Sequence, residues 1–434
     1  MEMLNAVPAL LRVGLVFGFL LFAIRKKLSL GSAFALASIL LGLLFGMRIA
    51  TLIGAILAAL AQPKTLALAV VVGLILVLSR SMESCGQMQR LLGRFEGLVR
   101  HPGINLITFP VLIGLLPMPG GAVFSAPMVQ AIGEPRGHDP AELSYVNYWF
   151  RHIWEYWWPL YPGILLGTAL AGVNLWLFVA VSFPMTLVAL AGGFLSLSRR
   201  SEMQPVASIA PRPPLTPFLK ELLPVLIVVL AGLGLGAALT HVLGSTASAV
   251  DKEAGLIIAL IIAIGWVWHV NGLSGQRRRE ILLHPEQLGI AYMVAGILVF
   301  KGILEASGAV DALSRELLAW HIPLLPVTLL LPFLVGGVAG ITIAFVGTTF
   351  PILIPLIQVA GQGEFLVLYL MLALVSGFTG VLLSPLHLCM LLSNSYFKAS
   401  SSDVYKLLWL PCGVLISSGC IYFLALKWII RQLS

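Results

Sequence analysis

Long runs of apolar residues, separated by short polar segments, recur along the whole chain. Most runs hold about 18–22 residues, which is enough for a helix to cross a hydrocarbon core of about 30 Å. Together they predict an all-α polytopic membrane protein. We expect helical spans near residues 6–24, 30–47, 65–82, 142–171, 173–197, 218–241, 254–272, 287–304, 364–397 and 405–430.

Two other apolar stretches, residues 103–132 and 322–360, are interrupted by glycine, proline and small polar residues. Proline removes a backbone donor and glycine permits tight turns, so a straight helix through either stretch would be costly. We expect each to form a re-entrant helical hairpin that enters and leaves on the same side. Non-helical backbone at membrane depth is tolerated where it lines a cavity, so the tips are candidate binding elements. The alternative is an ordinary span kinked by proline.

The fourth and the ninth predicted spans also contain breaks. The first broken span holds NYWFRHIWEYWWPLYPG (147–163), and the second holds SGFTGVLLSPLHLCMLLSNS (376–395). Prolines and glycines in the middle of both sequences predict that each span consists of two half-helices. The breaks occupy corresponding places in the two halves of the chain.

Three ionisable residues, Arg151, His152 and Glu155, lie among large aromatic residues in the first broken span. A helix that starts near Ala141 would carry them about halfway across the bilayer, where an isolated charge is costly. Arg151 and Glu155 are spaced i, i+4 and can pair, and His152 can carry a coupling proton. Two alternatives stay open. In the first, Arg151 and Glu155 form a pair with a purely structural role. In the second, the aromatic residues form an interfacial belt, and the charged residues lie at headgroup depth.

The two halves of the chain share an order of features. The segment SMESCGQMQRLL (81–92) resembles ILEASGAVDALS (303–314), and Glu83 matches Glu305 at an offset of 222 residues. In each half, three spans precede an amphipathic arm, a re-entrant hairpin, a broken helix and a final span. The charge pattern places the two arms on opposite sides. We therefore expect two inverted repeats, an arrangement found in many secondary transporters.

One polar, proline-rich segment, residues 198–217, divides the chain near its midpoint. We interpret it as a cytoplasmic linker between a first repeat, residues 1–197, and a second repeat, residues 218–434. With this division, each repeat contains one interrupted apolar stretch and one broken span, at corresponding positions in the two repeats.

Composition supports a membrane location and orients the chain. The sequence is 59% hydrophobic and only 10% charged, against about 25% charged in soluble proteins. Lys and Arg outnumber Asp and Glu by 26 to 18. They lie mainly in loops on one predicted side, which is the cytoplasm by the positive-inside rule. We thus expect an inner (plasma) membrane protein with both termini outside, and no nucleic-acid partner. The four cysteines lack paired metal-ligand spacing, so we interpret them as packing residues and expect no metal.

The order of arm, hairpin, broken helix and final span resembles the ion transporter superfamily, which includes gluconate permeases, four-carbon dicarboxylate carriers and divalent anion/sodium symporters. Within it, PMPGGAVFSAP and NYWFRHIWE look like a prokaryotic integral membrane family described as a domain of unknown function. The resemblance covers nearly the whole chain and implies an elevator-type movement and a homodimer. It also implies a scaffold and a mobile transport domain, formed respectively by residues 1–82 with 218–304 and by residues 103–197 with 322–434.

Carried over by position, the resemblance puts the hairpin tips at Pro119–Ser125 and Gly347–Thr349, and the helix breaks near Pro159 and Ser384-Pro385. The sodium symporters of the superfamily carry a Ser-Asn-Thr motif at their tips. Neither hairpin of this chain has that motif. Both Na⁺ and H⁺ therefore stay open as the coupling ion, and no other cofactor is expected.

These features predict a secondary active transporter of a small anionic molecule of the organic acid class. Arg151 and the helix N-termini at the hairpin tips favour negative charge. The expected substrate-binding residues are Gly120, Gly121, Ser125, Asn147, Arg151, Gly347, Thr348, Thr349, Ser384 and Asn394, and the expected coupling residues are His152, Glu155 and His387.

A translocase of a lipid or lipid-linked anion and a cation/proton antiporter are the alternative functions. An intramembrane enzyme is not expected, because the sequence has no His-Glu-x-x-His zinc motif and no Gly-x-Ser-x-Gly nucleophile elbow.

Overall fold

The computed structural model describes residues 7–95, 98–99, 101–118, 120–198, 213–243, 251–320 and 323–433, and every regular element in these ranges is a helix. The first half contains α2 (Ala9–Arg25), α3 (Leu30–Leu44), α4 (Ile49–Ala61), α5 (Pro63–Ser84), α6 (Gln87–Phe95), α7 (Pro102–Gly114), α8 (Ala122–Gly133), η1 (Glu134–Arg136), α9 (Pro140–Trp149), η2 (Phe150–His152), α10 (Pro162–Ala171), α11 (Leu175–Ser182) and α12 (Pro184–Ser198).

The second half contains α13 (Leu215–Leu243), α14 (Asp251–Val270), α15 (Gly275–Leu282), α16 (Pro285–Ala306), α17 (Ala309–Ala319), α18 (Leu324–Ala339), α19 (Thr342–Val359), η4 (Gly363–Phe365), α20 (Leu366–Leu382), α21 (Leu388–Phe397) and α22 (Ser401–Leu433). Most of the expected linker, residues 199–212, lies outside the described residues, as does Pro119.

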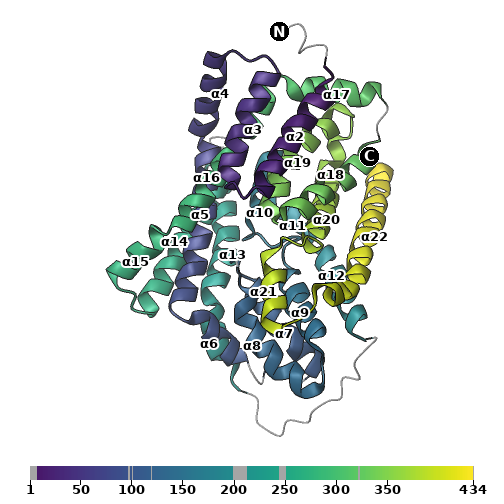
Figure 1. Cartoon of the computed structure of the whole chain (residues 1–434). Coiled ribbons are helices and arrows are strands. Elements are labelled where there is room, and N and C mark those ends of the chain that lie inside the picture. Colours follow the sequence, from purple (N-terminus) through teal and green to yellow (C-terminus); the bar gives the residue numbers. More distant parts are fainter. Residues whose placement is uncertain are drawn as a thin grey trace.

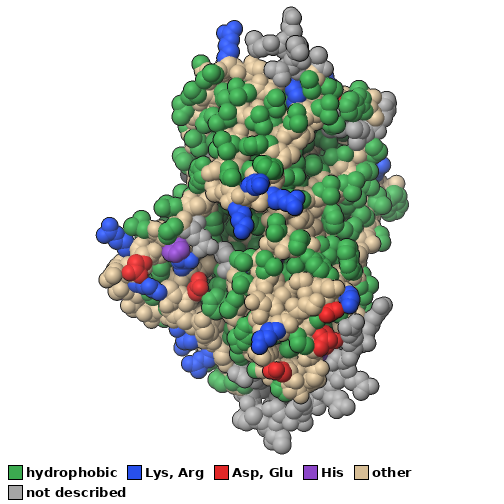
Figure 2. Space-filling model, viewed as in Figure 1, with side chains coloured by type: hydrophobic (Ala, Val, Ile, Leu, Met, Phe, Trp, Pro, Cys, Tyr) green, Lys and Arg blue, Asp and Glu red, His purple; other side chains and the backbone are tan. Residues whose placement is uncertain are grey.

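Among the described residues, seven helical segments are long and apolar enough to cross a membrane: Leu66–Ser84, Leu175–Leu197, Leu215–Gly232, Gly275–Ala306, Thr342–Val359, Gly363–Leu382 and Ser401–Gln432. Large apolar side chains are also exposed on many helices, and on the face drawn in Figure 2 they gather mainly over its upper part. On α22, for example, Trp409, Ile421 and Trp428 are each more than 60% exposed. A surface this apolar suits lipid rather than water. The helices therefore indicate a membrane-embedded, multi-pass protein.

One apolar helix was not expected. Residues 49–61, between the spans expected at 30–47 and 65–82, form α4, in which Ile49, Ile53 and Leu57 are exposed. With 13 residues, α4 is shorter than the apolar runs that predict a complete crossing. A search for full-length spans therefore overlooks it.

Both interrupted stretches form pairs of adjacent helices. α7 and α8 are joined through Met118, Gly120 and Gly121, and Gly120 has a φ of 71°. α18 and α19 are joined at Gly340, which ends α18 in the left-handed conformation with a φ of 66°. Residues with a side chain rarely adopt this conformation, so glycine permits both turns.

The position of the second turn corrects the expected tip. Gly347, Thr348 and Thr349 lie within α19, one to two turns after the connection at Gly340 and Ile341. Gly347 packs against Ile297 of α16. The hydroxyl of Thr348 donates to the carbonyl of Ala344, one turn earlier in its own helix, and Thr349 bonds to Phe345 in the same way. Residues 347–349 therefore belong to a continuous α-helix, Thr342–Val359, and do not form the turn.

The helices of the two pairs lie in opposite halves of the molecule (Figure 1). Figure 1 shows α7, α8 and α9 in its lower half with α21, whereas α18, α19 and α20 lie in its upper half with α10. The points where the helices are interrupted therefore come together in the middle, between the two groups.

Candidate functional site

The first broken span ends as an α-helix at Trp149, continues through η2 and irregular turns, and resumes as α10 at Pro162. Prolines at positions 159 and 162 cannot donate backbone hydrogen bonds, which favours an interruption before them. The second broken span ends at Leu382 and resumes as α21 at Leu388, with Pro385 between them. The two breaks are residues 150–161 and 383–387, and we refer to them as the first and second break.

The tips of both hairpins meet these two breaks. A Cβ added to Gly121 would lie 2.5 Å from Nη2 of Arg151, in the first break. A Cβ added to Gly340 would lie 3.0 Å from Oγ of Ser384, in the second break. Glycine at both positions allows the backbone to approach closely. Four segments without regular helical hydrogen bonding thus surround one buried centre.

Arg151 is the cation of this centre, and its side chain is only 3% exposed. Nη2 donates a hydrogen bond of 2.6 Å to the carbonyl of Met118, at the first hairpin tip. Nη1 lies 2.9 Å from Sγ of Cys389, in the first turn of α21. Nε has no hydrogen-bond partner among the described residues. The guanidinium is therefore buried with unused hydrogen-bonding capacity.

The expected pair between Arg151 and Glu155 does not form. No ion pair joins the two side chains within the described part of the chain. The i, i+4 rule applies to α-helices, but residues 150–152 are a 3₁₀ helix and residues 153–157 are turns. Glu155, 8% exposed, instead accepts a hydrogen bond of 2.7 Å from Thr342 at the start of α19. Thr342 also packs on Gly163 of α10.

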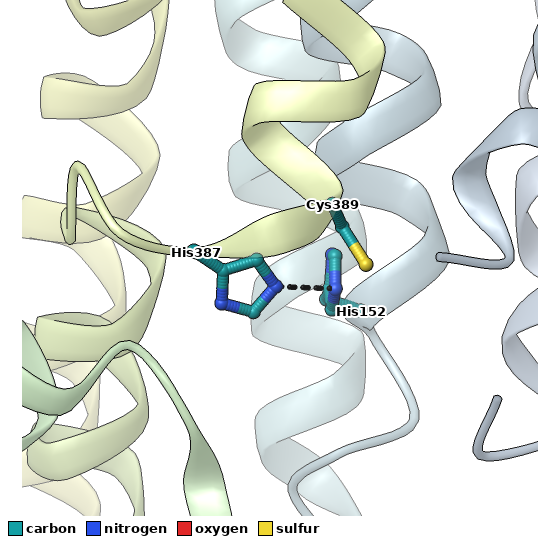
Figure 3. A group of neighbouring side chains, drawn as sticks. All are labelled: His152, His387 and Cys389. Atoms are coloured by element: carbon teal, nitrogen blue, oxygen red, sulfur yellow. Dashed lines mark hydrogen bonds between the residues drawn. The ribbon is translucent and has the colours of Figure 1, made fainter. Parts of the chain in front are cut away.

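Three further groups meet beside Arg151 (Figure 3). Nε2 of His152 lies 3.1 Å from Nε2 of His387, and both ring nitrogens and Sγ of Cys389 lie within 4.8 Å of one another. Nδ1 of His152 lies 2.6 Å from the carbonyl of Tyr148. A carbonyl can only accept, so Nδ1 carries the hydrogen and, in the neutral ring, Nε2 presents a lone pair to His387. Tyr148 stacks edge-on against both imidazoles and shields them.

The aromatic residues around the first break bind backbone rather than a membrane surface. The indoles of Trp154 and Trp158 donate to the carbonyls of Val111 and Leu115 at the end of α7, at 2.8 and 2.9 Å. The hydroxyl of Tyr161 donates to the carbonyl of Gly114 at 2.7 Å. The last carbonyls of a helix lack partners within it, and these side chains supply them. This explains the aromatic residues better than an interfacial belt does.

A second polar cluster joins α8, α9 and α21. Asn147 accepts a hydrogen bond of 2.6 Å from Ser125 and donates to Ser393 at 2.9 Å, while Ser144 donates to Asn394 at 2.5 Å. The structure thus brings three of the expected binding residues, Ser125, Asn147 and Asn394, into one buried region. Ser125 and Asn147 bind each other, and Asn394 binds Ser144 and Ser401, so their polar atoms already have protein partners. A buried polar network of this kind holds helices together.

The sequence interpretation missed four contributors to the centre. Cys389 was regarded as a packing residue, although it follows the expected residue His387 by two positions. Met118 contributes through its carbonyl and Tyr148 through its carbonyl and ring, so side-chain chemistry gives no signal for them. Thr342 lies at the true second tip, which was expected further along the chain.

Apolar helices of spanning length around a buried polar centre define a helical, multi-pass membrane protein. The chain belongs to the family described as "Protein of unknown function (DUF401)", whose sequence profile matches residues 10–426. The match runs from α2 to α22 and includes both hairpins and both breaks. A comparison with curated proteins gives no match.

Proposed function

We propose that the protein is a secondary active transporter of a small anionic molecule of the organic acid class, coupled to H⁺ or Na⁺. The observation that carries this proposal is the state of Arg151. Its guanidinium is buried, has no carboxylate partner among the described residues and keeps Nε unpartnered. An isolated charge at such depth is expensive, and a bound anion would offset that cost.

The order of helices supports a transporter built from two inverted repeats. α17 begins at Ala309, 222 positions after α6 begins at Gln87, and α18 begins at Leu324, 222 positions after α7 begins at Pro102. An arm, a helix pair, a broken helix and a final span follow in each half. Broken helices that meet at a shared centre are typical of secondary transporters.

The same arrangement supports membership of the ion transporter superfamily and an elevator-type mechanism. In that mechanism the hairpins and broken helices move as one transport domain against a scaffold formed by the first spans of each half, in a homodimer. The contacts among tips and breaks fit such a unit, because they bind the four interrupted segments to one another. Arg151 binds Met118 at the first tip, Glu155 binds Thr342 at the second tip, and His152 contacts His387 in the second break.

A cation/proton antiporter is a second candidate, and one observation favours it. Glu155 has no arginine partner among the described residues, and it faces the second tip through Thr342. An antiporter needs a buried acid that can exchange a proton for a cation, and a carboxylate paired with Arg151 could not serve. The two candidates differ in which residue is indispensable.

Uptake into proteoliposomes tests the proposal. We expect labelled organic anions to accumulate under an imposed proton or sodium gradient, and Arg151→Gln to abolish accumulation while Arg94→Gln, an exposed arginine in α6, transports normally. Normal uptake by Arg151→Gln, or absence of anion uptake by the wild-type chain, would refute the anion assignment. Cation exchange that needs Glu155 but not Arg151 would instead establish the antiporter.

A further inference from the structure

We propose that His152, His387 and Cys389 form a binding site for a thiophilic transition-metal ion of the Zn²⁺ class. The three side chains come from the first break, the second break and the first turn of α21. His152 is separated from His387 by 235 positions in the sequence. The fold therefore assembles this site, and it goes beyond the transport function proposed above.

The spacing of the ligand atoms fits such an ion. A metal about 2.0 Å from each imidazole nitrogen and about 2.3 Å from sulfur needs ligand atoms about 3.3–3.7 Å apart in tetrahedral geometry. The two Nε2 atoms are 3.1 Å apart, and all three ligand atoms lie within 4.8 Å of one another. Small rotations of the side chains would complete the geometry.

The surroundings of His152 orient it as metal ligands are usually oriented. Its Nδ1–H is held by the carbonyl of Tyr148, so its Nε2 lone pair faces the other two ligands. A hydrogen bond from the second ring nitrogen to a carbonyl is the common support of a metal-binding histidine. His387 would carry its hydrogen on Nδ1 when its Nε2 binds metal. That nitrogen is buried without a hydrogen-bond partner among the described residues, so its support would come from a water molecule or a small shift of the ring.

The donor set selects the metal class. Two imidazoles and a thiolate suit Zn²⁺, Co²⁺, Cd²⁺ or Cu⁺, whereas Mg²⁺ and Ca²⁺ prefer oxygen ligands. Binding releases the thiol proton of Cys389, because only the thiolate is a good ligand. While bound to the metal, Sγ would still accept the hydrogen bond from Nη1 of Arg151, 2.9 Å away, as an outer-shell contact of the metal site.

Nearby anionic groups would offset the charge of such an ion. A divalent metal, one thiolate and the carboxylate of Glu155 sum to zero, and Arg151 leaves the centre with one positive charge. Oε1 of Glu155 lies 3.8 Å from Nε2 of His152, so it could hydrogen-bond a water molecule at the fourth coordination position. A metal here would also join the first break to α21, so the two segments would move together.

Cobalt binding to the purified full-length chain in detergent, after treatment with a chelator, tests this site without any transport measurement. We expect one Co²⁺ per chain, with the visible bands of tetrahedral cobalt and a near-ultraviolet sulfur-to-cobalt band, both lost on addition of Zn²⁺. Cys389→Ser should remove the sulfur band, and His387→Ala should weaken binding by about 100-fold or more. Cys412→Ser, which changes another buried thiol, should leave the spectrum intact.

Two results would overturn the inference. One is a folded wild-type chain, with a normal melting temperature, that gives no sulfur-to-cobalt band. The other is a band that persists in both Cys389→Ser and Cys389→Ala but disappears in Cys412→Ser. Failure of anion uptake would not change the interpretation of these cobalt spectra. Absence of cobalt binding would leave the anion-transport proposal standing.

Discussion

Nη2 of Arg151 donates a 2.6 Å hydrogen bond to the carbonyl oxygen of Met118, which joins the first break to the tip of the first hairpin. The same carbonyl also accepts a hydrogen bond of 3.3 Å from the amide of Gly121 inside the turn, so the guanidinium uses its second lone pair. The bond gives the buried guanidinium a partner and ties the hairpin tip to the first break. Interrupted backbone inside a membrane protein needs such partners.

Gly121→Ala should disturb this junction. The new methyl group would lie 2.5 Å from Nη2 of Arg151, closer than van der Waals contact allows, so the guanidinium must move. We expect a lower melting temperature and reduced anion uptake, corresponding to about 1–3 kcal/mol of strain.

Gly413→Ala in α22 is the matched control for Gly121→Ala. No atom lies within 4 Å of its added methyl group. Helix propensity predicts that alanine there stabilises by up to about 1 kcal/mol. Equal melting temperatures and equal uptake for both variants would contradict the close approach of Gly121 and Arg151.

Thr342→Val should weaken the contact between the second hairpin tip and the first break. It keeps the shape of the side chain but removes the donor to Glu155, a bond of 2.7 Å. Loss of a partner for a buried polar group costs about 1–3 kcal/mol. Thermal unfolding in detergent measures this loss.

Thr349→Val separates that loss from a general effect of valine in α19. Thr349 is also buried, but its hydroxyl bonds only to the carbonyl of Phe345 in its own helix, which keeps its helical hydrogen bond after the change. We expect it to melt near the wild-type temperature. If Thr342→Val were no more harmful than Thr349→Val, the contact with Glu155 would contribute nothing.

Two neighbouring tryptophans test whether the aromatic residues support α7. The indole of Trp158 donates to the carbonyl of Leu115, whereas the indole nitrogen of Trp157 is buried without a partner. Trp158→Phe should therefore destabilise by about 1–3 kcal/mol more than Trp157→Phe. The difference in melting temperature between the two variants is the measurement, and an inverted order would refute this role.

Much of the fold follows from the sequence because its signals are local. Apolar runs indicate the spans, and Pro159, Pro162 and Pro385 indicate where two of them break. The second hairpin shows where local signals end. Its sequence offers glycines at 336, 337, 340 and 347, and only Gly340 has a positive φ. Gly340 packs against Ser384 in the second break. This contact joins residues 44 positions apart and forms only in the folded protein, so the sequence alone does not show which glycine makes the turn.

The centre of the site was only partly predictable for a similar reason. Arg151, His152 and Glu155 were recognisable because charge is rare in this chain, and the charges lie among aromatic residues. His387 was also expected as a coupling residue, but its contact with His152, across 235 positions, has no signal in the sequence. Cys389 and Met118 were not recognisable as partners, since one comes from the other half of the chain and the other contributes its backbone. The i, i+4 spacing misled because the helix ends before Arg151.

The central claim is that a negatively charged molecule reaches the buried guanidinium of Arg151 from water. The thiol of Cys389, 2.9 Å from Nη1, reports on this directly in a chain with Cys85, Cys412 and Cys420 changed to serine. The measurement is labelling of this chain in liposomes, with a chelator present, by membrane-impermeant methanethiosulfonates of either charge. We predict labelling by the anionic reagent that is faster than by its cationic analogue and slowed by the transported anion. A Cys389 that reacts only after denaturation, or that reacts faster with the cation, would contradict the account.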